Sequence, residues 1–280
     1  MYYTLNIKGI PHTITQPEVM GILNVTPDSF YAGSRKQTEH DIAERANEII
    51  SQGGAMIDVG AMSTRPGGDD VSEQEEMRRL RFALPIIRRE HPDAILSVDT
   101  FRPLVARMAV EEYGVDIIND VGQPVRDIDS GKADVSLLPM LQEVARLNVP
   151  YILMSRESNI QAMRRFFDET ILQFNSLPAG EGRGEAPFIL DPGYGFGKTL
   201  DENYDILRQQ SDLLSYNMPI LAGVSRKRMI WQLLNSSADE ALNGTTVLNT
   251  IALQQGAAIL RVHDVREAVE AIRLKIKVES

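Results

Sequence analysis

Short apolar runs alternate with longer helix-like segments from residue 19 to the end of this chain, and this alternation is the feature that most constrains its fold. Runs rich in strand-forming residues predict eight β-strands, at residues 19–25, 56–60, 95–99, 117–120, 151–154, 188–191, 220–224 and 257–262. Segments between them, such as 39–52, 73–89, 103–113 and 266–277, place apolar residues at helical spacing. Strands that alternate with helices favour a parallel sheet. Eight such units predict an α/β fold, the (β/α)8 or TIM barrel.

An open, doubly wound sheet is the structural alternative, and the positions of the polar residues argue against it. In an open sheet, ligand-binding groups gather where the strand order reverses. Here polar and charged residues follow nearly every predicted strand, which is typical of the mouth of a barrel. A length of 280 residues also suits one barrel, so we expect residues 1–280 to form a single domain.

The first residues predict a short β-hairpin ahead of the barrel. Tyr3, Leu5 and Ile7 alternate onto one face, a Lys-Gly pair can turn the chain, and residues 10–14 return. We expect this hairpin to cover the bottom of the barrel. The segment lacks the basic start and apolar centre of a secretory signal, and no apolar stretch approaches the roughly 20 residues that span a bilayer. We therefore expect a cytoplasmic protein without a membrane segment.

Composition argues against several classes of function. The formal net charge of −10 disfavours general nucleic-acid binding, which depends on many phosphate contacts from Lys and Arg. The chain has no Cys, and this excludes a disulfide framework, a thiolate metal site and a cysteine nucleophile. An anionic substrate would need basic residues concentrated in one place.

Carboxylate, amide and ammonium groups lie at the ends of several predicted strands. Asp99 ends the third strand, Asn119 lies in the fourth, Asp191 ends the sixth and Lys227 follows the seventh. Because parallel strands of a barrel end at the same mouth, we expect these side chains to converge. Asp99, Asn119 and Asp191 suit a guanidine-like ring edge, and Lys227 suits a ring carbonyl. These residues predict a site for a flat, amide-rich heterocycle.

Cationic and hydroxyl side chains follow the second and eighth predicted strands. Thr64 and Arg65 lie in a glycine-containing loop, and Arg261 and His263 lie at the end of the last strand. Such groups can hold a leaving phosphate and offset its charge as a bond breaks. His263 alone would more often be a satisfied core histidine, but beside Arg261 we interpret it as a ligand. Asn24 could hold Mg2+ through its amide oxygen.

Aromatic residues and glycines follow the sixth predicted strand in the segment Asp-Pro-Gly-Tyr-Gly-Phe-Gly-Lys. The glycines permit close approach of a ligand, and we expect Tyr194 and Phe196 to supply aromatic surface. Asp120, at the end of the fourth strand, has two interpretations: a ligand to the bound molecule, or a hydrogen-bonding group that only fixes the strand end.

These motifs, taken in order, closely resemble one family, dihydropteroate synthase, which joins a pterin diphosphate to p-aminobenzoate in the folate pathway. The resemblance covers nearly the whole chain and rests on the segments 21–30 (GILNVTPDSF), 63–67 (STRPG), 97–100 (SVDT), 118–121 (INDV), 190–198 (LDPGYGFGK), 225–227 (SRK) and 261–264 (RVHD). It implies a TIM barrel that is usually a homodimer and uses magnesium. Sulfonamides, which mimic p-aminobenzoate, are expected inhibitors.

The resemblance also implies roles for individual residues. The pterin ring would be held by Asp99, Asn119, Asp191 and Lys227, and the metal with the diphosphate by Asn24. The diphosphate would be bound by Thr64, Arg261 and His263. The p-aminobenzoate site would be shaped by Arg65, Phe196, Ser225 and Lys227. The implied mechanism is dissociative, and the residues expected to act in catalysis are Asp99, Lys227 and Arg65.

Two positions depart from the family pattern. Met62 stands where the family commonly has a glutamate, and Ser155 stands where a Met-His pair usually ends the fifth strand. Two alternatives also stay open. A corrinoid-dependent methyltransferase that uses methyltetrahydrofolate would share the ring-binding residues, and a non-catalytic pterin-binding paralogue would keep them without the anion site. The Ser-Thr-Arg-Pro-Gly loop and the Ser-Arg-Lys segment favour the synthase, because they suit a diphosphate and an aromatic acid.

Overall fold

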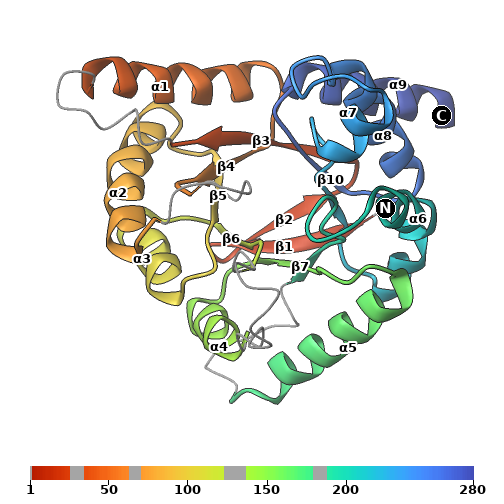
Figure 1. Ribbon diagram of the computed structural model, residues 1–280. Helices are drawn as coiled ribbons and strands as arrows, with labels where there is room; N and C mark the ends of the chain where they lie inside the picture. The colour runs from red at the N-terminus through yellow and green to blue at the C-terminus, as the bar shows by residue number, and fades with distance from the viewer. Residues whose placement is uncertain (1, 26–34, 63–70, 123–136, 179–187) are drawn as a thin grey trace.

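The centre of the molecule is a closed ring of parallel strands (Figure 1). The computed structural model describes residues 2–25, 35–62, 71–122, 137–178 and 188–280. The strands are β3 (Glu18–Asn24), β4 (Met56–Gly60), β5 (Ile95–Asp99), β6 (Ile117–Asp120), β7 (Tyr151–Met154), β8 (Phe188–Asp191), β9 (Leu221–Ala222) and β10 (Ile259–Val262). They pair in the order β8-β7-β6-β5-β4-β3-β10-β9. Leu190 of β8 also pairs with Ile220, just before β9, which closes the sheet and confirms the predicted (β/α)8 barrel.

Helices form the outer layer around these strands in Figure 1. They are α1 (Arg35–Ser51), α2 (Glu73–Glu90), α3 (Pro103–Tyr113), α4 (Leu138–Leu147), α5 (Ile160–Ser176), α6 (Leu200–Gln209), α7 (Arg228–Leu233), α8 (Leu242–Gln254) and α9 (Val265–Glu279), with a 3-10 helix at Gln210–Tyr216. Among the described helices, none has an apolar stretch long enough to cross a bilayer.

Local sequence signals explain where the helices begin. The side chain of Ser72 accepts a hydrogen bond from the backbone of Glu75 at the start of α2. Acidic residues in the first turn of α2 and basic residues in its last turn complement the helix dipole. At the start of α6, Thr199 and Glu202 form a reciprocal capping box. These caps fix the points at which the chain leaves the loops above the barrel.

The N-terminal hairpin closes the bottom of the barrel, as the sequence predicts. Strands β1 (Tyr3–Ile7) and β2 (Ile10–Ile14) pair in antiparallel fashion. Leu5 and Ile14 are buried in one apolar cluster with residues that begin the barrel strands, including Met56 and Ile117. This packing removes the lower end of the barrel from solvent.

A buried carboxylate ties the hairpin turn to this lower end. Asp116 lies just before β6, and its side chain is 2% exposed. Its Oδ2 accepts from Arg88 Nη2 and from the backbone of Leu96, each at 2.8 Å, and Lys8 Nζ lies 2.8 Å from Oδ1. Asp116 therefore joins α2, the sheet and the hairpin turn.

The seventh barrel strand is shorter than predicted, Leu221–Ala222 instead of residues 220–224. The carbonyl of Ile220 accepts from two backbone N–H groups, those of Ala258 at 2.8 Å and Ile259 at 3.1 Å. The regular pattern of one hydrogen bond per carbonyl between the strands is therefore broken at this point. At the other end, the backbone of Lys227 donates to Val224, which turns the chain out of the sheet. The early turn brings the Ser-Arg-Lys segment to the mouth of the barrel.

Candidate active site

Residues paired across the carboxyl ends of neighbouring strands form a row that brings polar side chains next to one another. Asn24 pairs with Gly60, Gly60 with Asp99, and Asp99 with Asn119. A Cβ on Gly60 would lie 3.1 Å from Asn24 Oδ1, so the glycine leaves room for the amide. The predicted convergence of Asp99 and Asn119 is therefore seen in the structure, with Asn24 in the same row.

A further carboxylate, Asp58, lies below this row and was missed by the sequence analysis. Asp58 is fully buried, and its Oδ2 accepts from Asn119 Nδ2 at 3.0 Å and from Arg261 Nε at 2.6 Å. Arg261 Nη2 also donates to Asp99 Oδ2 at 3.1 Å. The signal that could have revealed Asp58 is its position as the lone charge in the apolar run Met-Ile-Asp-Val-Gly.

Burial changes the charge state expected of Asp99. Removal from water raises the pKa of Asp99 to about 7; the guanidinium of Arg261 opposes this rise, and the carboxylate of Asp58 adds to it. Near neutral pH, Asp99 is therefore balanced between its protonated and ionised forms. A bound cationic group would favour the ionised form, and a bound acceptor the protonated one.

Lys227 and Asp191 interact at the mouth, where Asp191 ends β8 and Lys227 follows the neighbouring β9. Lys227 Nζ donates to the carbonyl of Tyr194 and lies 4.5 Å from the ring centroid of Phe196. Burial lowers the pKa of Lys227 to about 7, and the carboxylate of Asp191 opposes that shift. Burial also raises the pKa of Asp191, whose Oδ1 accepts from the backbone of Gly193 at 2.7 Å. Lys227 can therefore donate a hydrogen bond to a ligand, and Asp191 can accept one from a neighbouring atom of the same ligand.

The two aromatic residues after β8 have different surroundings. Phe196 is half-buried and lies beneath Lys227, as expected for a surface at the mouth. The expectation for Tyr194 is wrong: its ring is fully buried, and its hydroxyl donates to Gln210 Oε1 at 2.8 Å. Tyr194 is therefore a core residue, directly after Gly193, whose φ of 65° turns the chain.

Ser155 contributes to the site through its backbone. Lys198 Nζ donates to the carbonyls of Ser155 and Gly193, at 3.0 and 2.9 Å. A Cβ on Gly193 would lie 2.1 Å from the Ser155 carbonyl oxygen, so only glycine allows this approach. The Ser155 hydroxyl accepts from the backbone of Glu157 at 3.2 Å. Ser155, which departs from the family pattern, therefore supports the loop after β8 through its backbone carbonyl.

His263 is neutral in this environment. Burial, followed by the charge of Arg261, lowers its pKa to about 4. It can donate one hydrogen bond at neutral pH but carries no charge in the free protein. Its backbone donates to Ser225 Oγ at 3.1 Å, which joins the segments after β9 and β10.

Three other residues singled out from the sequence are Thr64, Arg65 and Asp120. Thr64 and Arg65 lie outside the described residues. Both oxygens of Asp120 accept within the protein, Oδ2 from the Tyr151 hydroxyl and Oδ1 from the Gly122 backbone, each at 2.7 Å. Asp120 is thus a group that fixes the end of β6, the second of its two interpretations.

The donor groups near Asn24 suit a metal ion that takes most of its ligands from elsewhere. Among the residues that the structure describes, no group of three or more His, Cys, Asp or Glu side chains is placed to hold a metal. Asn24 is exposed at the end of β3 and offers one amide oxygen. This arrangement fits a magnesium ion whose other ligands are phosphate oxygens and water, because Mg2+ commonly keeps several waters.

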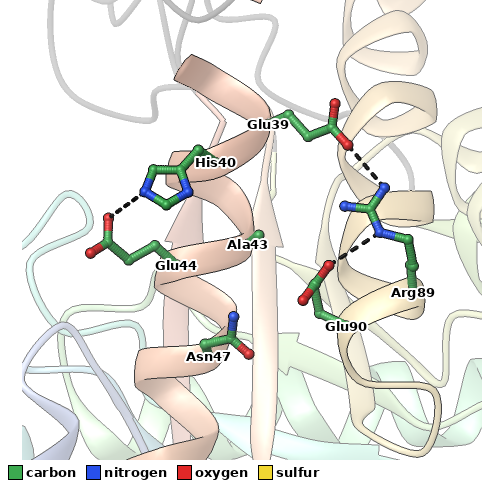
Figure 2. Close-up of a pocket in the computed structure, with 7 residues that line it drawn as sticks. All are labelled: Glu39, His40, Ala43, Glu44, Asn47, Arg89 and Glu90. Atoms are coloured by element: carbon green, nitrogen blue, oxygen red, sulfur yellow. Dashed lines mark hydrogen bonds and ion pairs between the residues drawn. The ribbon is translucent and has the colours of Figure 1, made fainter. Parts of the chain in front are cut away.

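A groove on the outer surface is separate from this site (Figure 2). It lies between α1 and α2 and is lined by Glu39, His40, Ala43, Glu44, Asn47, Arg89 and Glu90. Its charged groups pair with one another: Arg89 lies 2.9 Å from Glu39 and 3.1 Å from Glu90. None of the predicted site residues lines it, so we place the candidate site at the mouth of the barrel.

Comparisons of sequence and of structure find similar proteins. Residues 20–263 match the family described as pterin binding enzyme. The chain is 37% identical over 282 residues to the dihydropteroate synthase of Escherichia coli (strain K12), with 95% of this chain and 93% of that protein covered. Xanthomonas albilineans dihydropteroate synthase with 4-aminobenzoic acid aligns with a TM-score of 0.83 at 34% identity, covering 100% of this chain and 99% of that one. The Yersinia pestis enzyme with a sulfonamide drug complex gives 0.79 at 33% identity, with coverage of 99% and 100%.

The substitution Asp99→Asn should change how stability depends on pH. Between pH 3.8 and about 7, the folded chain holds a proton on Asp99 that the unfolded chain has released. The contribution of this group to stability therefore falls as the pH rises through that range. Asparagine does not titrate, so the free energy of unfolding of the variant, relative to wild type, should rise with pH. Denaturant unfolding at about pH 5 and about pH 8 measures the difference. If the difference in the free energy of unfolding between variant and wild type is the same at both pH values, the pKa of Asp99 is not raised in the folded protein.

Proposed function

This chain belongs to the dihydropteroate synthase family of pterin-binding enzymes, and on that basis we propose how its own residues carry out the reaction of the family. The enzyme is a transferase that joins 6-hydroxymethyl-7,8-dihydropterin diphosphate to p-aminobenzoate and yields 7,8-dihydropteroate and diphosphate. The observation that carries the proposed roles is the cluster of acceptor groups around Asn119 and Asp191, with Lys227 as the neighbouring donor. No specific observation favours the methyltransferase or the non-catalytic paralogue.

The pterin ring binds with its donor-rich edge against the acceptors of the barrel mouth. Asn119 Oδ1 is buried and has no hydrogen-bond partner among the described residues, so it can accept from a ring N–H. Asp191 presents a second buried acceptor, a carboxylate, and Lys227 can donate to the ring carbonyl. A ligand that donates to Asn119 Oδ1 would relieve the cost of burying that acceptor without a partner.

The diphosphate binds beside Arg261 and His263, with Thr64 as the proposed hydroxyl donor. Burial alone would lower the pKa of Arg261, but the carboxylates of Asp58 and Asp99 outweigh it and raise that pKa. Arg261 therefore brings a permanent positive charge to the site, and neutral His263 brings a hydrogen-bond donor. A fixed donor and a fixed charge stabilise the negative charge that develops on the leaving diphosphate.

The reaction is a substitution at the methylene carbon of the pterin. The bond from this carbon to the diphosphate oxygen breaks, and its electron pair leaves with the diphosphate. The ionised form of Asp99 stabilises the positive charge that develops on the pterin. The amine nitrogen of p-aminobenzoate then bonds to the carbon and releases one proton to solvent. Because the amine is neutral, positioning of the two reactants contributes more than a strong base.

The p-aminobenzoate site is formed by Lys227, Phe196 and Ser225, with Arg65 as the proposed cation for its carboxylate. Support comes from the Lys227 ammonium above the Phe196 ring and from Ser225, which follows β9 and whose Oγ accepts from the backbone of His263 after β10. Sulfonamides would compete for this site, in keeping with the drug named for the Yersinia pestis relative.

Magnesium is the proposed cofactor, held by Asn24 together with oxygens of the substrate diphosphate. When bound, the ion would neutralise part of the charge of the leaving diphosphate. Asn24 would orient the diphosphate end of the substrate through its amide oxygen, for which the lack of a side chain on Gly60 leaves room.

The chain is also proposed to form a homodimer in the cytoplasm, with residues 1–280 as one domain. Support for the dimer comes from apolar side chains exposed on adjacent helices. Leu233 and Leu234 at the end of α7 are 53% and 56% exposed, and Val247 of α8 is 49% exposed. Burying such surface against a second copy would be favourable.

The substitutions Asp191→Ala and Arg261→Ala should separate ring binding from use of the diphosphate. Loss of the Asp191 carboxylate should weaken binding of 6-hydroxymethylpterin, which has no diphosphate, about 10- to 100-fold, the range of a charge-assisted hydrogen bond. Loss of Arg261 should lower kcat/KM for the pterin diphosphate about 100-fold or more, with a smaller effect on 6-hydroxymethylpterin. Calorimetry and an assay of dihydropteroate and diphosphate release measure the two effects. Equal losses in both variants, or no turnover by wild type, would contradict these roles.

The substitution Asn24→Ala should act through the metal. The Mg2+ concentration that gives half-maximal turnover should rise about tenfold, because one ligand of the ion is lost. Binding of 6-hydroxymethylpterin without metal should stay at the wild-type value in calorimetry. A variant with an unchanged Mg2+ dependence would contradict the role of Asn24.

The substitution Leu234→Glu should weaken the dimer, because it places a charge in the proposed apolar interface. Light scattering after size-exclusion chromatography should give the wild-type protein about twice the 31.2 kDa of one chain, and the variant a lower mass. The matched control is Leu172→Glu on α5, where the exposed leucine lies outside the proposed interface. A monomeric wild-type protein would refute the proposal.

A further inference from the structure

The orientation of the Asn119 amide is determined by a neighbour that none of the proposed roles includes. Asp58 Oδ2 lies 3.0 Å from Asn119 Nδ2 and 2.6 Å from Arg261 Nε. Both Asp58 and Asn119 are fully buried. Asp58 Oδ1 and Asn119 Oδ1 are left without hydrogen-bond partners among the described residues.

The chemistry of the two groups allows one arrangement of the amide. The Asp58 oxygen that accepts from the Arg261 guanidinium is a hydrogen-bond acceptor, so the NH2 group of Asn119, and not its oxygen, faces it. The amide oxygen then points away from Asp58 and is left without a partner among the described residues. If the amide were reversed, two oxygens would face each other in a buried site, which is costly.

Arg261 keeps Asp58 in this acceptor role. Its guanidinium lies against the same oxygen that accepts from Asn119, and it supplies the positive charge opposite the carboxylate. Arg261 therefore acts on both parts of the site: its charge is placed for an anion, and its contact with Asp58 fixes the amide beneath the ring.

We propose that Asp58 is a positioning residue that presents the oxygen of Asn119 to the ligand and so selects a ring edge that donates hydrogen bonds. The inference rests on the proposed role of Asn119 in pterin binding. Asp58 itself need not touch the ligand. Its effect reaches the ligand through the amide, and this distinguishes it from a residue that only stabilises the fold.

The test is the affinity of the protein for 6-hydroxymethylpterin, measured by calorimetry in Asp58→Ala and Asp58→Asn. The alanine variant removes the acceptor, leaves the Asn119 amide free to turn, and should bind about tenfold more weakly, equivalent to about 1.4 kcal/mol. The asparagine variant keeps an acceptor oxygen opposite Asn119 and should recover most of the affinity. The KM for p-aminobenzoate should stay near the wild-type value in both. If the alanine variant does not fold, Asp58→Leu fills the space without an acceptor and carries the same expectation.

A double-mutant cycle with Asn119→Ala separates positioning from a general loss of structure. Once Asn119 is removed, Asp58→Ala should have little further effect on pterin affinity, since the amide that it positions is gone. The matched control is Asp116→Ala, which removes a buried carboxylate at the opposite end of the barrel. This control should lower the stability of the protein and leave pterin affinity unchanged.

Several results would overturn the inference. They are wild-type affinity in a folded Asp58→Ala variant, an asparagine variant no better than the alanine variant, or losses that add fully in the cycle with Asn119→Ala. Failure of the wild-type protein to bind 6-hydroxymethylpterin would instead remove the proposed function on which the inference rests.

Discussion

The ion cluster of buried Asp58 with partly buried Arg261 and Asp99 is the interaction on which the candidate site depends. Arg261 contacts the two carboxylates at 2.6 and 3.1 Å. Charges are costly to bury, and removing one partner of such a cluster leaves an uncompensated charge in the interior. The three residues come from β4, β10 and β5, and β3 lies between β10 and β4 in the sheet. The three strands therefore lie within one run of neighbouring strands, β5-β4-β3-β10, which brings the side chains together, and the cluster in turn holds the Asn119 amide.

The two ends of the barrel use buried charge for different purposes. At the bottom, each oxygen of Asp116 faces a cation of the protein: Oδ2 accepts from Arg88 and a backbone N–H, and Lys8 Nζ lies 2.8 Å from Oδ1. At the mouth, Asp58 and Asn119 each keep a buried oxygen without a partner among the described residues. This contrast follows the general division of the fold, in which the carboxyl ends of the strands carry function and the other end carries stability.

Much of the fold could be predicted from sequence because its strands are short, apolar and separated by amphipathic helices. The hairpin and nearly all of the strand positions followed from periodicity alone. Asp58 did not, because its partners Asn119 and Arg261 lie 61 and 203 residues away and nothing local marks the contact. Neutral His263 and buried Tyr194 were missed for a related reason: their states depend on burial and on neighbours that the closed barrel supplies.

The most direct test of the central claim is a crystal structure of this chain with 6-hydroxymethyl-7,8-dihydropterin diphosphate bound. The predicted result places the N–H edge of the ring within hydrogen-bonding distance of Asn119 Oδ1 and Asp191. It also places the diphosphate beside Arg261 and His263, while Asp58 still accepts from Asn119 Nδ2. A ring bound outside the barrel mouth, or one that meets the NH2 group of a reversed Asn119 amide, would contradict this account.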